Sequence, residues 1–529
     1  MALAPAESSR RPGPGAWPKP SLRSLLEDSG RFLTSVELVT SRGLITERSG
    51  RRGLELARLL SEDPRIDALS ITDNPGGNAM LSADTLGTDL ISRGQEVIIH
   101  LSCKDWNRNA LESRGWKLAS EGFQNVLALS GDYPNSGFRG QAQAVFDIDS
   151  AGLLRMFSDM NAGRPASPGQ PSRERTNFLL GAVVNNYKRH ENEVMPQYFK
   201  LGKKIENGAQ FIINQIGYDS RKQHELLEYM RLRGWSVPVV ANVYVLSLQA
   251  ARFFHAGRIP GCVVTDELLA VIEKQAASPD RGRAFFLEFA AKQVAIARGL
   301  GFRGAYLGGH LKYEDYNRIL DLAAGFSTGD WKLFAKEIGF HQPDEFYYFE
   351  PDPGTGLSST EVNRRYAASK TPEALAQARR EAPFSYKLNR ALHDQIFDPD
   401  GAGFRAARGL VQIAEKRGWS QALHRAEHAV KVLAFDCRDC GDCSLPEIAY
   451  LCPESQCAKN QRNGPCGGTR DGLCEVGEKQ CIWAKAYDRL KPYGEEEAML
   501  AGPVVFKNGA LKGTSAWANA LLGRDHRAE

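Results

Sequence analysis

The sequence of 529 residues has neither a long apolar run nor an excess of charge of one sign. No segment approaches the roughly 18 apolar residues that a membrane-spanning helix needs, so we expect no membrane association. The 67 Lys and Arg residues against 63 Asp and Glu leave a net charge of +4, which is too small to indicate nucleic-acid binding. A composition of 42% hydrophobic and 25% charged residues excludes global disorder and indicates a globular protein.

Cysteine is scarce over most of the chain. Only Cys103 and Cys262 precede residue 437, and we expect both to be buried small side chains. Near the N-terminus, Pro and Gly residues follow the basic pair 10–11 where a secretion signal would have an apolar stretch. We therefore expect a cytoplasmic protein with reduced cysteines, in which the eight cysteines between Cys437 and Cys481 are metal ligands rather than disulfides.

Short apolar runs rich in β-forming residues alternate with helical patterns over the first 310 residues. There are eight such runs, at 35–40, 68–72, 96–103, 125–131, 178–184, 209–218, 237–245 and 303–309. Eight strands alternating with helices predict a (β/α)8 barrel. An open doubly wound sheet is the alternative, but the sequence lacks the Gly-rich dinucleotide loop that such folds often carry.

The length favours at least two domains, because single cores seldom exceed about 250–300 residues. The pattern predicts five segments: a flexible tail at 1–22, the barrel at 23–325, a helical connector at 326–430, a cysteine-rich domain at 431–492 and a C-terminal tail at 493–529.

Polar side chains within or just after the predicted strands are the candidates for chemistry, because barrel active sites gather at the C-terminal strand ends. Glu37 stands out, since a carboxylate inside an apolar strand is costly to bury unless it is used. Burial raises the pKa of a carboxyl group, which suits a general acid near neutrality. A salt-bridged structural glutamate is the alternative.

The first 320 residues resemble the methylenetetrahydrofolate reductase family, a family of flavin-dependent barrels. The matching stretches are Val36-Glu37-Leu38, Ile99-His100-Leu101-Ser102-Cys103, Leu129-Ser130-Gly131-Asp132, and Gly208-Ala209 with Asn214-Gln215. The resemblance implies that Glu37 is the general acid that helps open the ring of 5,10-methylenetetrahydrofolate. It also implies that Asp132 faces both flavin and pterin and that Gln215 binds folate.

The resemblance further implies which residues bind the flavin. Thr72, His100, Gly131 and Ala182 fall on flavin-contacting positions, and Lys203 and Lys204 fall on basic residues near the flavin phosphates. Cations suit that place because they balance phosphate charge. A solvated helix face is the alternative for the two lysines.

Two positions depart from the family pattern. Ser130 stands where the family has an arginine, which alters the flavin site and leaves the choice between FAD and FMN open. The family's stacking aromatic residue after the seventh strand falls near Ser247, and Tyr244 is the nearest aromatic ring, so it is the candidate for stacking on substrate. This departure puts direct use of NADH in question.

The cysteine-rich region opens with a Cys-x2-Cys-x2-Cys run, which is typical of [4Fe–4S] ligation. The eight candidate ligands are Cys437, Cys440, Cys443, Cys452, Cys457, Cys466, Cys474 and Cys481. Eight thiolates suffice for two four-cysteine clusters, and we expect the first three to share one of them. Zinc is the alternative, although zinc sites more often use paired Cys-x2-Cys knuckles.

This region resembles the MetV-type domain, also called the methylenetetrahydrofolate reductase C-terminal domain. The matching stretches are the opening 437–443, Cys452-Pro453, Cys457, 463–468, 472–476 and Cys481-Ile482-Trp483. That domain carries iron–sulfur clusters and partners the flavin barrel, and here it is fused behind one.

The main hypothesis is therefore a flavoenzyme that reduces 5,10-methylenetetrahydrofolate to 5-methyltetrahydrofolate. NAD(P)H, or a protein donor such as a ferredoxin acting through the clusters, would supply the electrons. The second hypothesis is a folate- or flavin-binding assembly protein whose zinc-stapled tail docks a methyltransferase. The third is a flavoenzyme acting on another one-carbon carrier. All three are compatible with a homo-oligomer.

Overall fold

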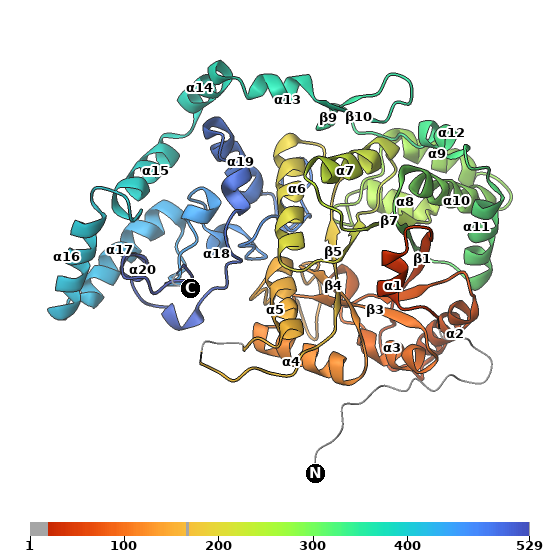
Figure 1. The fold of residues 1–529 in the computed structure, drawn as a ribbon, viewed down its shortest axis with the longest axis horizontal. Coiled ribbons are helices and arrows are strands. Elements are labelled where there is room, and N and C mark those ends of the chain that lie inside the picture. Colours follow the sequence, from red (N-terminus) through yellow and green to blue (C-terminus); the bar gives the residue numbers. More distant parts are fainter. Residues whose placement is uncertain (1–18, 166–168, 528–529) are drawn as a thin grey trace, which may run out of the picture.

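Eight parallel strands close into a barrel in chain order, as a computed structural model that describes residues 19–165 and 169–527 shows (Figure 1). The strands are β1 (Leu33–Leu38), β2 (Ala68–Ile71), β3 (Glu96–Ser102), β4 (Asn125–Leu129), β5 (Leu179–Val184), β6 (Phe211–Asn214), β7 (Val239–Tyr244) and β8 (Gly304–Gly308). Each strand overlaps one of the eight predicted runs. The predicted (β/α)8 barrel is confirmed, and the open doubly wound sheet is excluded because β1 pairs with β8.

Helices surround the barrel and cover its outer surface. They are α2 (Arg48–Glu62), α3 (Ala83–Ser92), α4 (Arg108–Ser120), α5 (Ser150–Ala162), α6 (Glu191–Glu206), α7 (Ser220–Leu232), α8 (Leu248–His255), α9 (Asp266–Ala276), α10 (Arg283–Leu300) and α11 (Tyr313–Gly325). Side chains alternate along each strand, so Val36 and Leu38 pack against the helices while Leu33 belongs to the cluster inside the barrel.

A short helix, α1 (Leu22–Glu27), packs its leucines into the cluster inside the barrel. The hydroxyl of Ser21 caps this helix by accepting a hydrogen bond from the backbone N–H of Ser24. The predicted tail 1–22 reaches into this helix, and its residues 1–18 lie outside the described part of the chain. The loops that follow the strands lie at the opposite, C-terminal end, which we call the mouth of the barrel.

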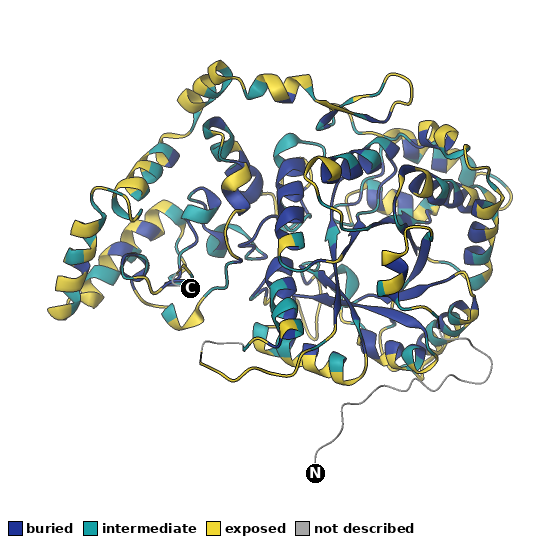
Figure 2. Cartoon of the chain, viewed as in Figure 1, coloured by how far each residue is buried: buried dark blue, intermediate teal, exposed yellow. Residues whose placement is uncertain are grey.

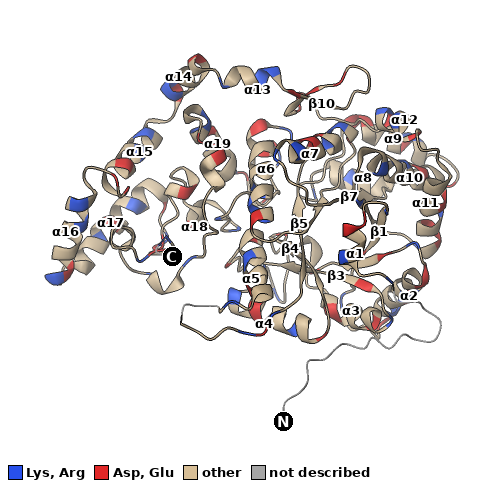
Figure 3. Ribbon diagram, in the orientation of Figure 1, with Lys and Arg blue, Asp and Glu red and all other residues tan. Residues whose placement is uncertain are grey.

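An arm of helices leads away from the barrel (Figure 1). The chain passes through α12 (Trp331–Glu337) and the antiparallel pair β9 (Phe349–Pro351) and β10 (Ser358–Val362). The arm itself comprises α13 (Arg364–Ser369), α14 (Pro372–Glu381), α15 (Phe384–Ile396), α16 (Phe404–Lys416) and α17 (Ser420–Phe435). Helices α13 to α16 each carry Lys or Arg (Figure 3), and α14 has no buried residue, so much of the arm is solvated.

The cysteine module, residues 437–527, lies beside the barrel on the α6 side (Figure 1). It contains short elements: η2 (Pro446–Ile448), α18 (Pro453–Gln456), α19 (Ile482–Leu490), η3 (Lys491–Tyr493), η4 (Glu497–Leu500), η5 (Gly509–Leu511) and α20 (Ala516–Leu521). The segment expected as a C-terminal tail packs back onto this module up to residue 527. For example, the backbone N–H of Val505 donates to the side chain of Asn463 over 2.7 Å.

Helix α6 is enclosed between the barrel and the module (Figure 2). Twelve of its sixteen residues are buried. The ring of Phe199 on α6 lies 6.3 Å from the ring of Tyr487 on α19. Throughout the described residues, every helix is too short or too polar to cross a membrane.

Candidate active site and cysteine centres

Polar side chains from several strands converge at the mouth of the barrel. Glu37 comes from β1, Tyr244 from the end of β7 and Tyr306 from β8. Gly308 leaves the space that this arrangement needs, because a Cβ atom there would lie 2.6 Å from Oε2 of Glu37 and 3.4 Å from the Tyr244 ring. The geometry brings together two residues that the sequence singled out, Glu37 and Tyr244.

Glu37 has no basic partner among the described residues. No lysine or arginine of residues 19–165 and 169–527 forms an ion pair with it, in contrast to the alternative of a salt-bridged structural glutamate. Burial raises the pKa of the Glu37 carboxyl group, and the hydroxyl of Tyr306 opposes this shift. A carboxyl group in such surroundings retains its proton at higher pH than an exposed one.

Asp132 and Gln215 lie in the same mouth, and both are partly exposed. Oδ2 of Asp132 accepts a hydrogen bond of 2.7 Å from the backbone N–H of Gly76. Oε1 of Gln215 lies 3.8 Å from the sulfur of Cys262. Burial, followed by the negative charge of Asp132, raises the pKa of the Cys262 thiol to about 12, and Glu37 adds to this shift. Cys262 is therefore buried as expected, but it also borders the mouth.

Three residues at which the resemblance implies flavin contacts lie on strands β2, β3 and β5. Thr72 follows β2 and is buried against the backbone of Leu38. His100 lies inside the barrel with Nε2 2.8 Å from the Ser70 hydroxyl, and burial lowers its pKa to about 4, so it is neutral near pH 7. Ala182 packs in the layer between strands and helices, so its side chain points away from the inside of the barrel.

The end of β4 is in direct contact with the cysteine module. The hydroxyl of Ser130 donates to Oε1 of Gln461 over 3.1 Å. The ammonium group of Lys459 donates to the carbonyl oxygen of Gly131 over 2.7 Å. The module therefore reaches the Ser130–Gly131 positions that were expected to contact a flavin.

Lys203 and Lys204 also have partners within the protein. The ammonium group of Lys203 donates to the carbonyl oxygens of Leu500 and Pro503, both in the module, over 3.4 and 3.1 Å. That of Lys204 donates to the carbonyl oxygen of Val183 over 2.6 Å, and burial lowers its pKa to about 7. Both residues are buried rather than forming a solvated helix face.

The eight cysteines divide in chain order around two cavities. The first group consists of Cys437, Cys440, Cys443 and Cys452. Two buried cations accompany it: Nζ of Lys431 lies 3.6 Å from the sulfur of Cys443, and Arg462 lines the same cavity. The three cysteines of the opening run thus line one cavity together with Cys452, and a cluster shared by them stays a prediction.

The second group lines the other cavity and consists of Cys457, Cys466, Cys474 and Cys481. Lys459 lines this cavity as well and forms an ion pair with Glu475. Burial raises the pKa of the Cys481 thiol to about 12, while backbone N–H groups at the start of α19 donate to its sulfur and oppose this shift. Amide groups directed at sulfur are typical of metal-bound cysteine.

The sulfur atoms within each group do not form a compact triad of the kind that surrounds a zinc ion. No three of the eight cysteine sulfurs, all of which belong to described residues, lie within 4.8 Å of one another. Four thiolates bound 2.3 Å from one zinc ion would lie about 3.8 Å apart. The short helix α18 lies between Cys452 of the first group and Cys457 of the second. The five residue steps between these two cysteines correspond to about 8 Å of helical rise.

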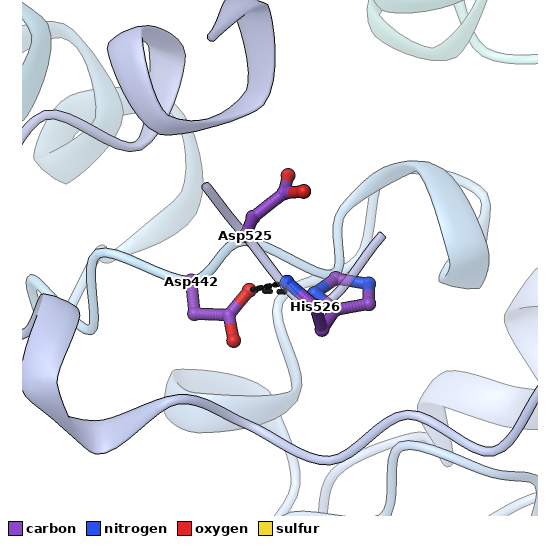
Figure 4. A group of neighbouring side chains, drawn as sticks. All are labelled: Asp442, Asp525 and His526. Carbon is purple, nitrogen blue, oxygen red and sulfur yellow. Dashed lines mark hydrogen bonds and ion pairs between the residues drawn. The ribbon is translucent and has the colours of Figure 1, made fainter. Parts of the chain in front are cut away.

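Near residue 527, His526 is bonded to the carboxylate of Asp442, and Asp525 lies beside them (Figure 4). Nδ1 of His526 lies 2.5 Å from Asp442 and Nε2 lies 3.2 Å from Glu447, whereas Asp525 pairs with Arg527 over 2.8 Å. Burial alone would lower the pKa of His526, but the two carboxylates raise it to about 9. The imidazolium uses both nitrogens as donors, so this group, which we call the C-terminal clasp, is an ion pair rather than a metal site.

Comparison with known families matches both parts of the chain. Residues 23–303, which are 281 of the 529 residues, match the family described as Methylenetetrahydrofolate reductase. The chain belongs to the methylenetetrahydrofolate reductase family. Residues 417–508 match the family described as Methylene-tetrahydrofolate reductase C terminal. The prediction of a reductase-family barrel fused to that C-terminal domain is therefore confirmed.

Individual relatives of this reductase-family chain are distant. It is 25% identical over 266 residues to Methylenetetrahydrofolate reductase (NADH) 1 of Arabidopsis thaliana, covering 46% of this chain and 40% of that protein. It is 25% identical over 190 residues to Methylenetetrahydrofolate reductase 2 of Saccharomyces cerevisiae, covering 35% of this chain and 29% of that protein. The chain thus spans less than half the length of either relative.

Among solved structures, the chain is similar to an uncharacterized protein from Clostridium thermocellum that binds two copies of 5-methyl-5,6,7,8-tetrahydrofolic acid. The identity is 11% and the TM-score 0.41, over 57% of this chain and 97% of that one. A similarity of this size carries no argument about the ligands of this reductase-family chain.

Several residues of these sites carried no signal in the sequence. Tyr306 lies in an apolar strand and has the pattern of a core residue, and Lys459 and Gln461 stand between cysteines with no distinctive spacing. Their positions depend on contacts between the module and the barrel. A pattern within one segment cannot indicate such contacts.

Proposed function

We propose that this protein reduces 5,10-methylenetetrahydrofolate to 5-methyltetrahydrofolate, with a flavin at the barrel mouth and two [4Fe–4S] clusters in the cysteine module. The observation that supports this most is the position of the second cysteine group. It lies against the end of β4, beside the mouth that contains Glu37. Family membership supports the same reaction.

We propose that Glu37 holds the proton that opens the five-membered ring of the substrate. Its carboxyl group has no cationic partner among the described residues, and burial favours its neutral, proton-donating form. Asp132 is fixed by the backbone N–H of Gly76, and Gln215 would offer its amide to the pterin. We propose that Tyr244, which lies beside Glu37 across Gly308, stacks on the bound substrate.

A bound flavin would supply the hydride that reduces the methylene carbon. The strand ends that carry Thr72, His100 and Gly131 would hold its ring. Lys203 and Lys204 already donate to backbone carbonyls, so we propose that they anchor the module and the strand rather than flavin phosphates.

The surroundings of the cysteines support clusters rather than zinc. The compact tetrahedron of a zinc site would bring at least three sulfurs within 4.8 Å of one another, which no three of the described cysteines do, whereas a cubane cluster holds its cysteine sulfurs farther apart. Buried cations stand beside both groups, Lys431 at the first and Lys459 at the second. They would offset the negative charge of metal-bound thiolates.

The order of the two groups suggests the route of the electrons. The first group borders helix α17 of the arm, and the second borders the barrel. We therefore propose a small protein donor such as a ferredoxin, which would deliver electrons to the first cluster. NAD(P)H is the alternative donor, and the name of the Arabidopsis relative states NADH for that protein.

Anaerobically purified protein tests this proposal. We expect bound flavin, about eight iron atoms per chain if both clusters are [4Fe–4S], and no stoichiometric zinc. Reduced ferredoxin should support formation of 5-methyltetrahydrofolate more effectively than NADH or NADPH. Protein containing zinc and no iron would contradict the electron route and favour the assembly protein with a zinc-stapled tail.

A further inference from the structure

The cysteine module places a buried cation at the end of β4. The side chain of Lys459 is only 6% exposed, and its ammonium group donates to the carbonyl oxygen of Gly131 over 2.7 Å. Asp132 is the next residue, and its negative charge acts on Lys459. Lys459 is more than 300 residues from both in the sequence, so only the docking of the module brings them together.

The same lysine is tied to the second cysteine group. Lys459 forms an ion pair with Glu475, whose side chain is also 6% exposed. Oε1 of Glu475 in turn lies 3.7 Å from the sulfur of Cys466. Gly468 makes room for this arrangement, since a Cβ atom at that position would collide with the Glu475 carboxylate. A continuous set of contacts therefore runs from Gly131 through Lys459 and Glu475 to Cys466.

Neighbouring contacts hold this set of contacts, which we call the Lys459–Glu475 bridge, in place. Oε1 of Gln461 accepts hydrogen bonds from Ser130 over 3.1 Å and from Lys200 over 3.2 Å. The backbone carbonyl of Gln461 accepts a further bond of 3.1 Å from the indole of Trp483. These partners come from β4, α6 and α19, so the segment that carries Lys459 is fixed from three sides.

We propose that Lys459 is a positioning residue that couples the charge of the second cysteine group to the Gly131–Asp132 end of the flavin site. Position 130, directly before Gly131, carries an uncharged serine, and Lys459 supplies a positive charge to that strand end from the module. The inference rests on the proposed function, because the quantity it predicts is the reduction potential of the bound flavin.

Substitution of Lys459 and substitution of Glu475 should shift the reduction potential of the flavin in opposite directions. Lys459→Met removes a positive charge and leaves Glu475 unpaired, which disfavours added electrons and makes the flavin midpoint potential more negative. Glu475→Gln leaves Lys459 unpaired and makes the potential more positive. At a fixed solution potential, we expect each single variant to change the ratio of reduced to oxidised flavin at least tenfold. For a two-electron couple this corresponds to a shift of about 30 mV in the midpoint potential.

Three further variants separate charge from structure. Lys459→Arg keeps the charge and should restore the wild-type potential. The double variant Lys459→Met/Glu475→Gln removes both charges and should return the potential close to wild type. Lys491→Met removes another lysine of the module that pairs with the barrel, at Glu191 over 2.5 Å, and should shift nothing because Lys491 lines neither cysteine cavity.

The experiment is anaerobic redox titration of the full-length protein, followed by the flavin absorbance and by electron paramagnetic resonance of the clusters. Opposite shifts in the two single variants support the bridge. Shifts of the same sign, or none, in protein that retains flavin, iron and turnover overturn it and leave the proposed function intact. Wild-type protein without flavin or iron overturns the proposed function, and the bridge with it.

Discussion

The barrel mouth and the cysteine module differ in which charge state their surroundings favour. At the mouth, Glu37 is buried without a cationic partner among the described residues, so its neutral form is favoured. In the module, buried Lys431 and Lys459 stand beside the cysteines and favour negative charge. This contrast fits the proposed function, in which the mouth supplies a proton and the module carries electrons to the flavin.

The largest effect on the reaction rate should come from changing Glu37, the proposed proton donor. We expect Glu37→Gln to lower the rate of methylenetetrahydrofolate reduction by at least about 100-fold, because an amide cannot donate the required proton. Flavin reduction by the donor should continue at the wild-type rate, as stopped-flow absorbance would show. Glu62→Gln, an exposed change at the end of α2, is the control. A variant at position 37 with full folate reduction would show that the mouth does not supply the proton.

A change in the cysteine module should instead slow the delivery of electrons to the flavin and leave the later reduction of the substrate intact. Cys466→Ser should remove about half of the iron and slow donor-driven flavin reduction by about tenfold or more, because it removes a ligand of the second group. Flavin reduced chemically with dithionite should still pass its electrons to the substrate. Cys103→Ser, a buried barrel cysteine outside the module, should keep its full iron content. If Cys466→Ser also retains all of its iron, the second group is not a cluster site.

A smaller effect is expected at Tyr306, where a substitution should shift the pH dependence of the rate without abolishing activity. The hydroxyl of Tyr306 opposes the rise in the pKa of Glu37, so Tyr306→Phe should raise that pKa further. Since the acid must be protonated, the alkaline limb of the pH–rate profile should then move to higher pH. Tyr229→Phe, at a buried tyrosine on α7, should leave the profile in place. A shift of the limb to lower pH would contradict the assigned contact.

The smallest effect concerns the stability of the module. The pKa of His526 is about 9 in the folded chain, above the usual value of about 6.5 for an unfolded one. The stabilisation from the C-terminal clasp is therefore fully present below about pH 6.5 and is lost as the pH rises through 9. His526→Gln should lower the Tm at pH 6 and have little effect at pH 10, where wild type and variant should melt alike. An equal difference at both pH values would exclude an ion pair as the cause.

The barrel was predictable because its information is local. Each apolar run is enough to predict one strand, and Glu37 was visible as a carboxylate inside such a run. The polar layer around it was only partly predictable, since Tyr306 occupies a position that an ordinary core residue could also fill. The division of the eight cysteines into two groups follows chain order, but spacing alone did not distinguish this from ligands exchanged between groups.

The docking of the module was not predictable, because it depends on pairs of residues far apart in the chain. Lys200 is one example: it reaches Gln461 and the carbonyl of Gly464, although an amphipathic helix normally leaves such lysines in water. The pattern of α6 has no feature that distinguishes a lysine facing solvent from one facing a second domain. Only the folded chain shows that this helix has a neighbour on both sides.

The enclosure of α6 has a practical consequence for how the chain can be divided. A fragment that ends with the barrel at Gly325 would expose Phe199 and the lysine-bearing face that the module now covers. Such a fragment would be prone to aggregate, whereas independent domains separate cleanly at their linker. The barrel and the module should therefore melt as one cooperative unit, and limited proteolysis should cut the exposed arm before it separates them.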